Sequence, residues 1–381
     1  MKKVYLHDDA IISPLGFSTA ENLQAIKEEY SGLKLHQKNS LSAKEFYGGI
    51  IEEKKLENSF DKIADNSDFT RLEKMMILAV HEILKKNPDL NFNNCGLVIS
   101  TTKGNIDLLE AEGLLNKKVF LTELAKSIGE YFGFKAEPVV VSNACISGGL
   151  ALIVGKNLIT SGQFQRVIVV GGDLLSKFVL SGFSSFQAVS AVPCKPFSKS
   201  RSGISLGEAA AAVLLNSERK EKDNIALIAG SSANDANHIS GPSRTGEGLF
   251  KTIQKVLKQS GLQPEDLDYI SAHGTATPYN DEMEAIALSR SGLSHVPVNS
   301  LKGYYGHTLG ASALVESIIT KHSLLNNELY CSLNFEESGV SKPLNIIRQY
   351  EKEELSFALK TASGFGGCNL SLIFEKEKNG R

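Results

Sequence analysis

The stretch PVVVSNACISGGLALIV, residues 138–154, decides the fold because it joins two apolar runs through a short turn. The first run predicts a buried strand, and the second, which is apolar on all sides, predicts a buried helix. Cys145 therefore lies in a strand-to-helix turn, where the unpaired amides and the dipole of the helix favour the thiolate. The small residues 147–149 allow a substrate or a neighbouring helix to approach closely. This geometry suits an acyl-accepting nucleophile; on this stretch alone, a packed core cysteine is the alternative.

Valine- and isoleucine-rich strands alternate with helical stretches along the whole chain. Because their apolar runs are continuous, they predict mostly parallel sheets covered by helices on both faces. The charged segment SERKEKDN at 217–224 separates an N-terminal half (1–222) from a C-terminal half (223–381) with a comparable set of strands. We therefore predict an α/β protein made of two similar halves. The expected strands are 96–101, 138–142, 166–171, 209–215, 225–229, 269–272, 296–299, 356–362 and 369–374.

The composition excludes several classes of protein. The chain has 381 residues and a formal net charge of −2, so no general attraction to nucleic acid or to an anionic membrane surface is expected. No apolar run reaches the roughly 20 residues that a membrane-spanning helix needs, and the N-terminus lacks a signal-peptide pattern. The five cysteines are scattered without CxxC spacing, which argues against a disulfide framework and a structural zinc site. We expect a cytoplasmic protein that binds no metal, membrane or nucleic acid.

A histidine follows an apolar strand in the segment SAHGTATPYNDEME, residues 271–284. His273 enters a turn of glycine, threonine and proline, and three acidic residues follow closely. Loops at strand ends are where α/β folds place their chemistry. His273 is therefore a candidate catalytic residue, although a lone histidine is more often a surface or hydrogen-bonded core residue.

Two glycine-rich segments complete the set of candidate motifs. In NSLKGYYGHTLGASA, residues 299–313, Lys302 and His307 lie in a loop that leads into an apolar helix. In SGFGGCN, residues 363–369, a glycine-rich turn joins two strands, and its backbone amides are placed to form part of an oxyanion hole. Such turns often serve only to reverse the chain. His307 gains weight because it shares with the first histidine a position beside an apolar strand, glycine and threonine.

Together these motifs resemble the β-ketoacyl-acyl carrier protein synthases of the thiolase superfamily, in particular the elongating class that uses one cysteine and two histidines. The resemblance runs from IISPLG at 11–16 to the last glycine-rich turn, so it covers nearly the whole chain. It implies the five-layered αβαβα thiolase fold, assembled as a homodimer. The matching motifs, in the family's order, are NAC at 143–145, HGTATP at 273–278, Lys302 with GHTLGA at 306–311, and GFGG at 364–367.

The resemblance implies roles in two half-reactions. Cys145 would take an acyl chain from its carrier protein as a thioester, while the backbone amides of Cys145 and Phe365 hold the oxyanion. His273 and His307 would stabilise the enolate that forms when malonyl-acyl carrier protein loses its carboxylate, and the enolate carbon would attack the acyl-cysteine. Phe365 would also act as a gate between the half-reactions. No soluble cofactor is implied, because the phosphopantetheine arm arrives on the carrier protein.

Acidic and hydroxyl side chains receive supporting roles from the same resemblance. Lys302 would hold the second histidine or support the local electrostatics, with Glu284 as its partner. Asp281 and Glu284 match acidic positions near the family's active site. Thr275 and Thr277 would hydrogen-bond the phosphopantetheine arm.

The chain departs from the family around the expected acyl pocket. Lys103 stands where the family has an aliphatic side chain that reaches across the dimer interface into the partner's pocket. A buried ammonium without a partner is costly, so Lys103 either shortens the pocket or meets a polar or aromatic end of the acyl chain. The alternative is a lysine that faces solvent or binds a backbone carbonyl. Phe183 and Ile146 are the other candidates for lining the pocket.

Other functions fit the same motifs. A non-catalytic chain-length partner of a heterodimeric synthase usually lacks the nucleophile, so the presence of Cys145 and both histidines argues against that role. A thiolase-like enzyme acting on coenzyme A esters would use a second cysteine as base; Cys368 is present, but its surroundings resemble those of the synthases. The pathway, whether fatty-acid or specialised polyketide synthesis, stays open. Acyl carrier protein is the expected partner, and a heterodimer with a related subunit is the alternative to a homodimer.

Overall fold

The computed structural model describes residues 3–64, 68–112, 116–220, 224–235 and 241–377. The boundary expected between residues 222 and 223 lies outside the described residues. In the N-terminal half, hydrogen-bonded neighbours follow the order β5-β4-β6-β8-β1. These strands are β1 (Tyr5–Ile12), β4 (Cys95–Ser100), β5 (Val139–Val141), β6 (Arg166–Asp173) and β8 (Ala209–Asn216).

The C-terminal half repeats this arrangement in the order β11-β10-β15-β16-β9, with β13 added outside β11. Numbered along the chain, the five strands of each half lie in the order 3-2-4-5-1. In both halves strands 3, 2 and 4 are parallel, whereas strands 5 and 1 run antiparallel to their neighbours. These strands are β9 (Ile225–Asn234), β10 (Tyr269–Ser271), β11 (Pro297–Asn299), β13 (Asn345–Ile346), β15 (Phe357–Gly364) and β16 (Cys368–Lys376).

The sheet is therefore mixed, and the expectation of mostly parallel sheets is wrong. The difference arises because the glycine-rich turn after β15 sends β16 directly back beside it, which only an antiparallel pairing allows. Tyr5 of β1 pairs with Ala226 of β9, so the two halves join edge to edge.

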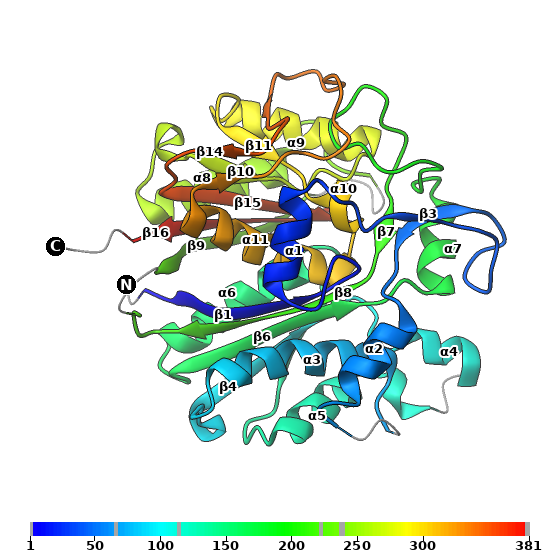
Figure 1. The fold of residues 1–381 in the computed structure, drawn as a ribbon. Helices are drawn as coiled ribbons and strands as arrows, with labels where there is room; N and C mark the ends of the chain where they lie inside the picture. The colour runs from blue at the N-terminus through cyan, green and yellow to red at the C-terminus, as the bar shows by residue number, and fades with distance from the viewer. Residues whose placement is uncertain (1–2, 65–67, 113–115, 221–223, 236–240, 378–381) are drawn as a thin grey trace.

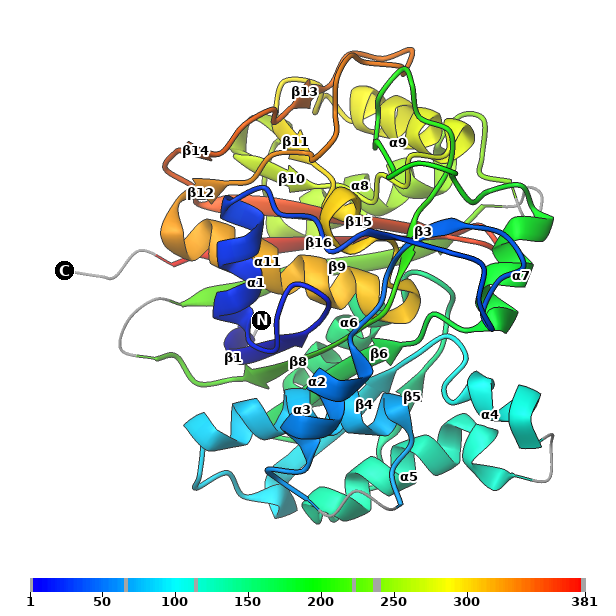
Figure 2. The same cartoon turned by 45° about the vertical axis from the view of Figure 1, so that its right-hand side comes forward.

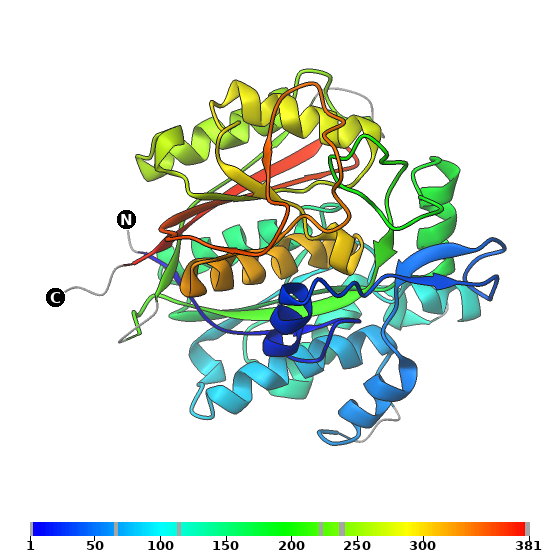
Figure 3. The same ribbon diagram turned by 45° about the horizontal axis from the view of Figure 1, so that its top comes forward.

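Helices complete the expected αβαβα layering, shown in Figure 1 from α8 and α9 at the top to α3 and α5 at the bottom. The middle layer consists of α6 (Ser147–Thr160) and α11 (Ser312–Asn326), which pack against each other and against both halves of the sheet. Figure 3 shows α11, in orange, between the two sets of strands. The outer helices are α3 (Arg71–Lys86), α5 (Leu121–Phe132), α8 (Glu247–Ser260) and α9 (Pro278–Arg290).

Glycine lets the two central helices approach closely. A Cβ atom on Gly148 would lie 2.8 Å from the backbone nitrogen of Leu314 and 2.9 Å from the carbonyl oxygen of Gly310. No side chain fits at that distance, so the expectation that residues 147–149 permit close approach of a neighbouring helix is confirmed.

Every expected strand is present, although β9 continues to Asn234. The expectation that the strand before Ser142 is buried is wrong, because β5 is the edge strand of the sheet and Val139 is exposed. Strand β1 escapes sequence reasoning because YLHDDAII places three polar residues within an apolar pattern, and Asp9 among them is buried through contacts with Lys321 and His322. No helix among the described residues is long and apolar enough to cross a membrane. Figures 1 and 2 place α7 and β3 together at one side of the layers. The remaining elements are β2 (Lys34–His36), β3 (Phe46–Gly49), β7 (Leu206–Gly207), β12 (Glu328–Leu329), β14 (Glu351–Lys352), α1 (Thr19–Lys27), α2 (Glu53–Phe60), α4 (Ile106–Glu112), α7 (Lys177–Ser185) and α10 (Lys302–Tyr305).

Candidate active site

One cavity brings together residues from both halves of the chain. It encloses about 340 Å³ and is lined by Cys145 from the first half and by His273, His307 and Phe365 from the second. Each motif singled out in the sequence therefore contributes to a single site. Three of the four turns that carry these motifs are strained, because each of the three contains a non-glycine residue with positive φ, a feature that clusters at functional sites. These residues are Ala144 (φ 43°), Ala276 (φ 63°) and Leu309 (φ 52°).

The turn that holds Cys145 is fixed by hydrogen bonds from one serine. The Ser147 hydroxyl accepts a 2.8 Å bond from the backbone N–H of Asn143 and donates a 2.7 Å bond to the carbonyl of Ala144. Helix α6 begins at Ser147, so Cys145 lies just before its N-terminus, as the sequence predicts. The thiol is buried yet reaches the cavity.

Burial dominates the acidity of this thiol. It raises the pKa of Cys145 to about 11, although the charges of Lys302 and Lys103 and the backbone N–H of Phe365 act in the opposite direction. Desolvation of the charged form therefore opposes the thiolate that the helix N-terminus is expected to favour. The Phe365 amide does lie beside the sulfur, where an oxyanion hole requires a donor.

The two histidines face each other in the cavity. Their ring centroids are 5.2 Å apart and the rings are nearly perpendicular, at 83°. The Nδ1 atom of His307 accepts a 3.3 Å hydrogen bond from the backbone N–H of Leu309, so the ring proton resides on Nε2. That Nε2 atom is buried without a partner among the described residues. His307 therefore presents one free N–H donor to whatever enters the cavity.

Both imidazoles are held in the neutral form. Burial, followed by the charge of Lys302, lowers the pKa of His273 and of His307 well below the usual 6.5. Lys360 contributes to both shifts, and Lys103 contributes to that of His307. A neutral ring with a fixed proton can donate one hydrogen bond to a developing anion.

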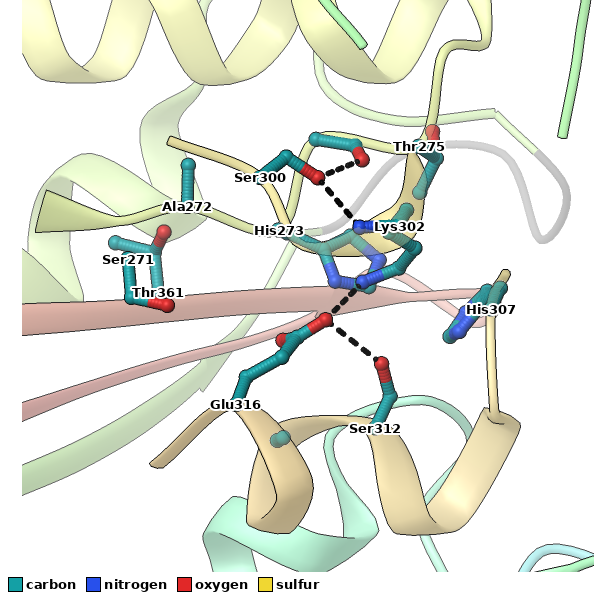
Figure 4. A network of polar contacts seen from close by, with 12 residues as sticks. Ser271, Ala272, His273, Thr275, Ser300, Lys302, His307, Ser312, Glu316 and Thr361 are labelled. Carbon is teal, nitrogen blue, oxygen red and sulfur yellow. Dashed lines mark hydrogen bonds and ion pairs between the residues drawn. The ribbon is translucent and has the colours of Figure 1, made fainter. Parts of the chain in front are cut away.

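Lys302 is paired with Glu316, so the expected pairing with Glu284 is wrong. Its ammonium lies 2.5 Å from the Glu316 carboxylate, which also accepts a 3.0 Å bond from the hydroxyl of Ser312 (Figure 4). Glu316 belongs to α11, the helix that directly follows the His307 loop, and both charged groups are buried there. Burial raises the pKa of Glu316, but Lys302 and Lys360 outweigh it, so the carboxyl stays charged.

Glu284 and Asp281 instead hold the backbone of the first histidine loop. Glu284 accepts 2.8 Å bonds from the backbone N–H groups of His273 and Gly274. Asp281 accepts a 2.9 Å bond from the N–H of Thr275. Burial raises the pKa of Asp281 to about 6. Both acids, which lie on α9, position the loop and are not among the residues that line the cavity in the described chain.

Thr275 and Thr277 do line the cavity, and their hydroxyl groups lie 2.8 Å apart. Phe365 stands at the turn between β15 and β16, is 37% exposed, and contacts the rings of Phe183 and Phe186 at centroid distances of 5.4 and 5.3 Å. This aromatic ring is therefore placed beside the nucleophile with one face open, as a gate requires.

Of the other expected pocket residues, Phe183 lines this cavity and Ile146 does not, whereas Lys103 is expected in the pocket of a partner subunit. Within the described chain, the lining of the cavity includes neither Ile146 nor Lys103. Ile146 is fully buried in the core that α6 shares with α11, because it is the residue from which the helix starts. Lys103 is half-buried, and its ammonium donates to the hydroxyl of Thr102 at 3.1 Å.

Sequence reasoning missed three residues of the site. Asp173, at the end of β6, accepts bonds from the N–H groups of Thr102 at 2.9 Å and Gly310 at 2.7 Å, and so joins the loops of the two halves. Glu316 and Lys360 are the others. Each is a charged residue in a largely apolar helix or strand, which is the local signal that the sequence offers.

Comparisons with known proteins cover both halves. Residues 17–221 match the N-terminal domain of beta-ketoacyl synthases, and residues 225–336 match the C-terminal domain. A protein of Schizosaccharomyces pombe named putative 3-oxoacyl-[acyl-carrier-protein] synthase, mitochondrial, is 28% identical over 99% of both chains. A Saccharomyces cerevisiae 3-oxoacyl-[acyl-carrier-protein] synthase homolog is 30% identical over 84% of this chain and 79% of its own.

Solved structures share the fold. The ketosynthase ApeO of Xenorhabdus doucetiae, in complex with its chain length factor ApeC, superposes with a TM-score of 0.85 at 23% identity, covering 99% of this chain and 98% of that one. The ishigamide ketosynthase/chain length factor gives a TM-score of 0.87 at 21% identity over 99% and 100% of the two chains. At these identities the likeness establishes the thiolase-like architecture alone.

Proposed function

The chain belongs to the beta-ketoacyl synthase family and is a condensing acyltransferase, and we propose that it elongates an acyl group held on Cys145 with a malonyl unit from acyl carrier protein, giving 3-oxoacyl-acyl carrier protein. The observation that carries this proposal is the convergence of the buried thiol and two neutral imidazoles on one cavity. A nucleophile alone would support acyl transfer, but the paired donors supply what an enolate needs.

In the first half-reaction, the Cys145 sulfur attacks the carbonyl carbon of an acyl-carrier protein thioester. The carbonyl oxygen becomes an oxyanion, which the backbone N–H groups of Cys145 and Phe365 hold. The bond to the pantetheine sulfur then breaks, and the thiol proton of Cys145 leaves with the pantetheine thiol. The proximity of the Phe365 amide to the sulfur supports this step.

In the second half-reaction, the malonyl carboxylate leaves as carbon dioxide, and the electron pair moves onto the thioester oxygen as an enolate. His273 and His307 donate hydrogen bonds to that oxygen. The enolate carbon then attacks the acyl-Cys145 carbonyl, and the cysteine sulfur leaves as a thiolate, which takes one proton from solvent. Neutral imidazoles support this division of labour, because an imidazolium would donate its proton and quench the carbanion.

We propose acyl carrier protein as both donor and acceptor partner, with no separate cofactor. A homodimer is the first assembly to test. A heterodimer with a related subunit is the second, since two similar ketosynthase structures were solved with a chain length factor. We propose a cytoplasmic location. The alternative is a mitochondrial location, which the name of the fission-yeast relative gives for that protein.

Mass spectrometry of the intact protein tests the proposal. Incubation with an acyl-carrier protein is expected to add the mass of one acyl group, and addition of malonyl-carrier protein is expected to remove it as 3-oxoacyl product. A non-catalytic chain-length subunit would show neither change. A thiolase-like enzyme would accept the coenzyme A esters in preference to the carrier-protein esters.

A further inference from the structure

Lys360 is a fully buried lysine in β15 that the reaction described above does not use. Its ammonium donates hydrogen bonds to three backbone carbonyls, those of Thr361 at 2.6 Å, Ser271 at 3.2 Å and Ala272 at 3.3 Å. It also lies 2.7 Å from the second carboxylate oxygen of Glu316, forming an ion pair. The charge is thus enclosed entirely by oxygen atoms.

The carbonyl groups that Lys360 binds belong to the segment that carries the first histidine. Ser271 ends β10, and Ala272 directly precedes His273. Any displacement of these two carbonyls moves the backbone of His273 with them. The hydroxyl of the neighbouring Thr361 donates a 2.6 Å bond to Glu284, which holds the histidine backbone from the other side.

Glu316 connects this lysine to the second histidine. One oxygen of its carboxylate meets Lys360 and the other meets Lys302, which begins the short helix α10 that leads to His307. The chain of contacts from the His273 strand through Lys360, Glu316 and Lys302 to the His307 loop contains no exposed group. In Figure 4 the pair of Lys302 and Glu316 lies close to His273, which follows Ala272, and to the loop that carries His307.

A buried ammonium in this place needs a reason beyond packing. An apolar side chain would avoid the desolvation cost and is often as stabilising as a buried ion pair. A charge that is satisfied by the backbone next to a reacting group instead fixes geometry, and a misplacement of 1 Å at such a site costs about 100-fold in rate. The other charged or titratable groups that act on the two histidines are Lys302 and, for His307, Lys103.

We propose that Lys360 is a positioning residue for the second half-reaction: its ammonium is a tethered cation that fastens the His273 segment to Glu316 and thereby sets the separation of the two imidazoles. The cage of carbonyl and carboxylate oxygens is one that a small monovalent cation also accepts. Removal of the lysine side chain therefore leaves a site that ammonium or potassium ions can fill.

Lys360→Met tests the proposal with a side chain of similar length and no charge. Because the proposal rests on the condensing function, two reactions are measured separately: acylation of Cys145 by acyl-carrier protein and decarboxylation of malonyl-carrier protein. We expect acylation within about twofold of wild type and decarboxylation reduced by about 10- to 100-fold. An unchanged decarboxylation rate, or an equal loss of both reactions in a folded variant, would overturn the proposal.

Lys360→Ala distinguishes a role of the ammonium charge from a role in packing alone, because an added cation can replace the missing charge. Decarboxylation by this variant is expected to recover at least in part with ammonium chloride or potassium chloride, but not with tetramethylammonium chloride at the same ionic strength. Failure of both small cations to restore a folded Lys360→Ala variant contradicts the tethered-cation role. If Lys360→Met does not fold, the proposal is tested by decarboxylation measured with Lys360→Ala in ammonium chloride.

Lys321→Met is the matched control, because it removes another buried lysine of the central layer, one that contacts Asp9 and the carbonyl of His7. It is expected to lower thermal stability while leaving the ratio of decarboxylation to acylation unchanged. A wild-type protein that neither acylates Cys145 nor decarboxylates malonyl-carrier protein would refute the proposed function itself, before any comparison of variants.

Discussion

The loop between β5 and α6 in the N-terminal half and the loop between β11 and α11 in the C-terminal half occupy matching places in the same strand order. Each follows the third strand of its half and leads into a helix of the middle layer. The first carries Cys145, the proposed nucleophile, and the second carries Lys302 and His307. The same strand order thus places a thiol from one half and an imidazole from the other half in one cavity.

Equivalent positions of the fourth strand in the two halves differ in charge. Ser100 of β4 pairs with Gly171, whereas the corresponding Ser271 of β10 pairs with Lys360. A Cβ atom on Gly171 would lie 2.3 Å from the hydroxyl of Ser100, so no side chain fits in the first half where the second half holds an ammonium. The nucleophile needs close backbone approach, while the histidines need fixed charges around them.

The central helices differ in the same way. The fifth residue of α6 is Ala151, and the fifth residue of α11 is Glu316, which pairs with two buried lysines. The two halves therefore share one strand order but differ in buried charge near the cavity. The N-terminal half holds almost none there, whereas the C-terminal half holds Glu316 and its two lysines. If this difference is functional, changes in each half should impair different half-reactions.

Cys145→Ala gives the largest effect expected. Loss of the nucleophile should reduce condensation by at least about 10⁴-fold, because no other group in the cavity can form the thioester. Decarboxylation of malonyl-carrier protein should persist, since the histidine half is intact. Thermal denaturation controls for folding, and condensation near the wild-type rate in this variant would refute the assignment of the nucleophile.

His273→Ala and His307→Ala should impair the second half-reaction, which depends on the C-terminal half of the chain. Each is expected to reduce decarboxylation by about 10²- to 10⁴-fold, the range for loss of a positioned donor, while acylation of Cys145 continues. Carbon dioxide release and intact-protein mass measure the two steps. Variants that lose acylation and keep decarboxylation would show that the division of labour runs the other way.

Glu316→Gln tests the charge network that distinguishes the halves. It keeps the size of the side chain but leaves two buried ammonium groups without a counter-charge, so the free energy of unfolding should fall by about 3–5 kcal/mol. Decarboxylation should fall more than acylation. Ala151→Gly, at the matching place in α6, is the control and should lower stability by only about 1 kcal/mol. Equal losses in the two variants would contradict the charge comparison.

The pH dependence of the free energy of unfolding tests whether the two histidines are neutral in the folded protein. Their folded pKa values lie well below 6.5, so the unfolded chain binds protons first as the pH falls. The free energy of unfolding should therefore decrease below pH 6.5, by about 1.4 kcal/mol per pH unit for each histidine. Asp281, whose pKa is raised to about 6, acts in the opposite direction. The double variant His273→Asn/His307→Asn isolates the histidine contribution: its curve should be flatter than that of wild type, and identical slopes would contradict it.

Lys103→Ile gives the smallest effect, because it removes a charge that the N-terminal half contributes from outside the cavity lining. We expect the ratio of condensation rates for long and short saturated acyl-carrier proteins to rise by about tenfold or less, the range for modest changes in an apolar pocket. An unchanged ratio would leave chain selection to other residues, with Phe183 the next to test.

Local sequence patterns were sufficient for the strands and for the three residues that meet in the cavity. Cys145, His273 and His307 each lie in a short contiguous motif whose strand, turn and helix are visible in the chain. The duplicated arrangement was also predictable, because both halves carry comparable strand sets. The mixed direction of the sheet was not, since it depends on which edge each returning strand joins.

Partners across space were not predictable from local patterns. Glu284 and Glu316 are both acidic residues near Lys302 in the sequence, and only the packing of α11 selects Glu316. Lys360 is the one charged residue of β15, as a solvent-facing strand residue would be, yet both faces of β15 are covered, so it is buried.

The most direct test of the account is intact-protein mass spectrometry of the His273→Ala/His307→Ala double variant, first with acyl-carrier protein and then with malonyl-carrier protein. The account predicts one acyl group on the peptide that contains Cys145, and persistence of that adduct after malonyl-carrier protein is added. Wild type should lose the adduct under the same conditions. Absence of the adduct in a folded double variant, or its conversion to 3-oxoacyl product, would contradict the separation of the two half-reactions between the two halves.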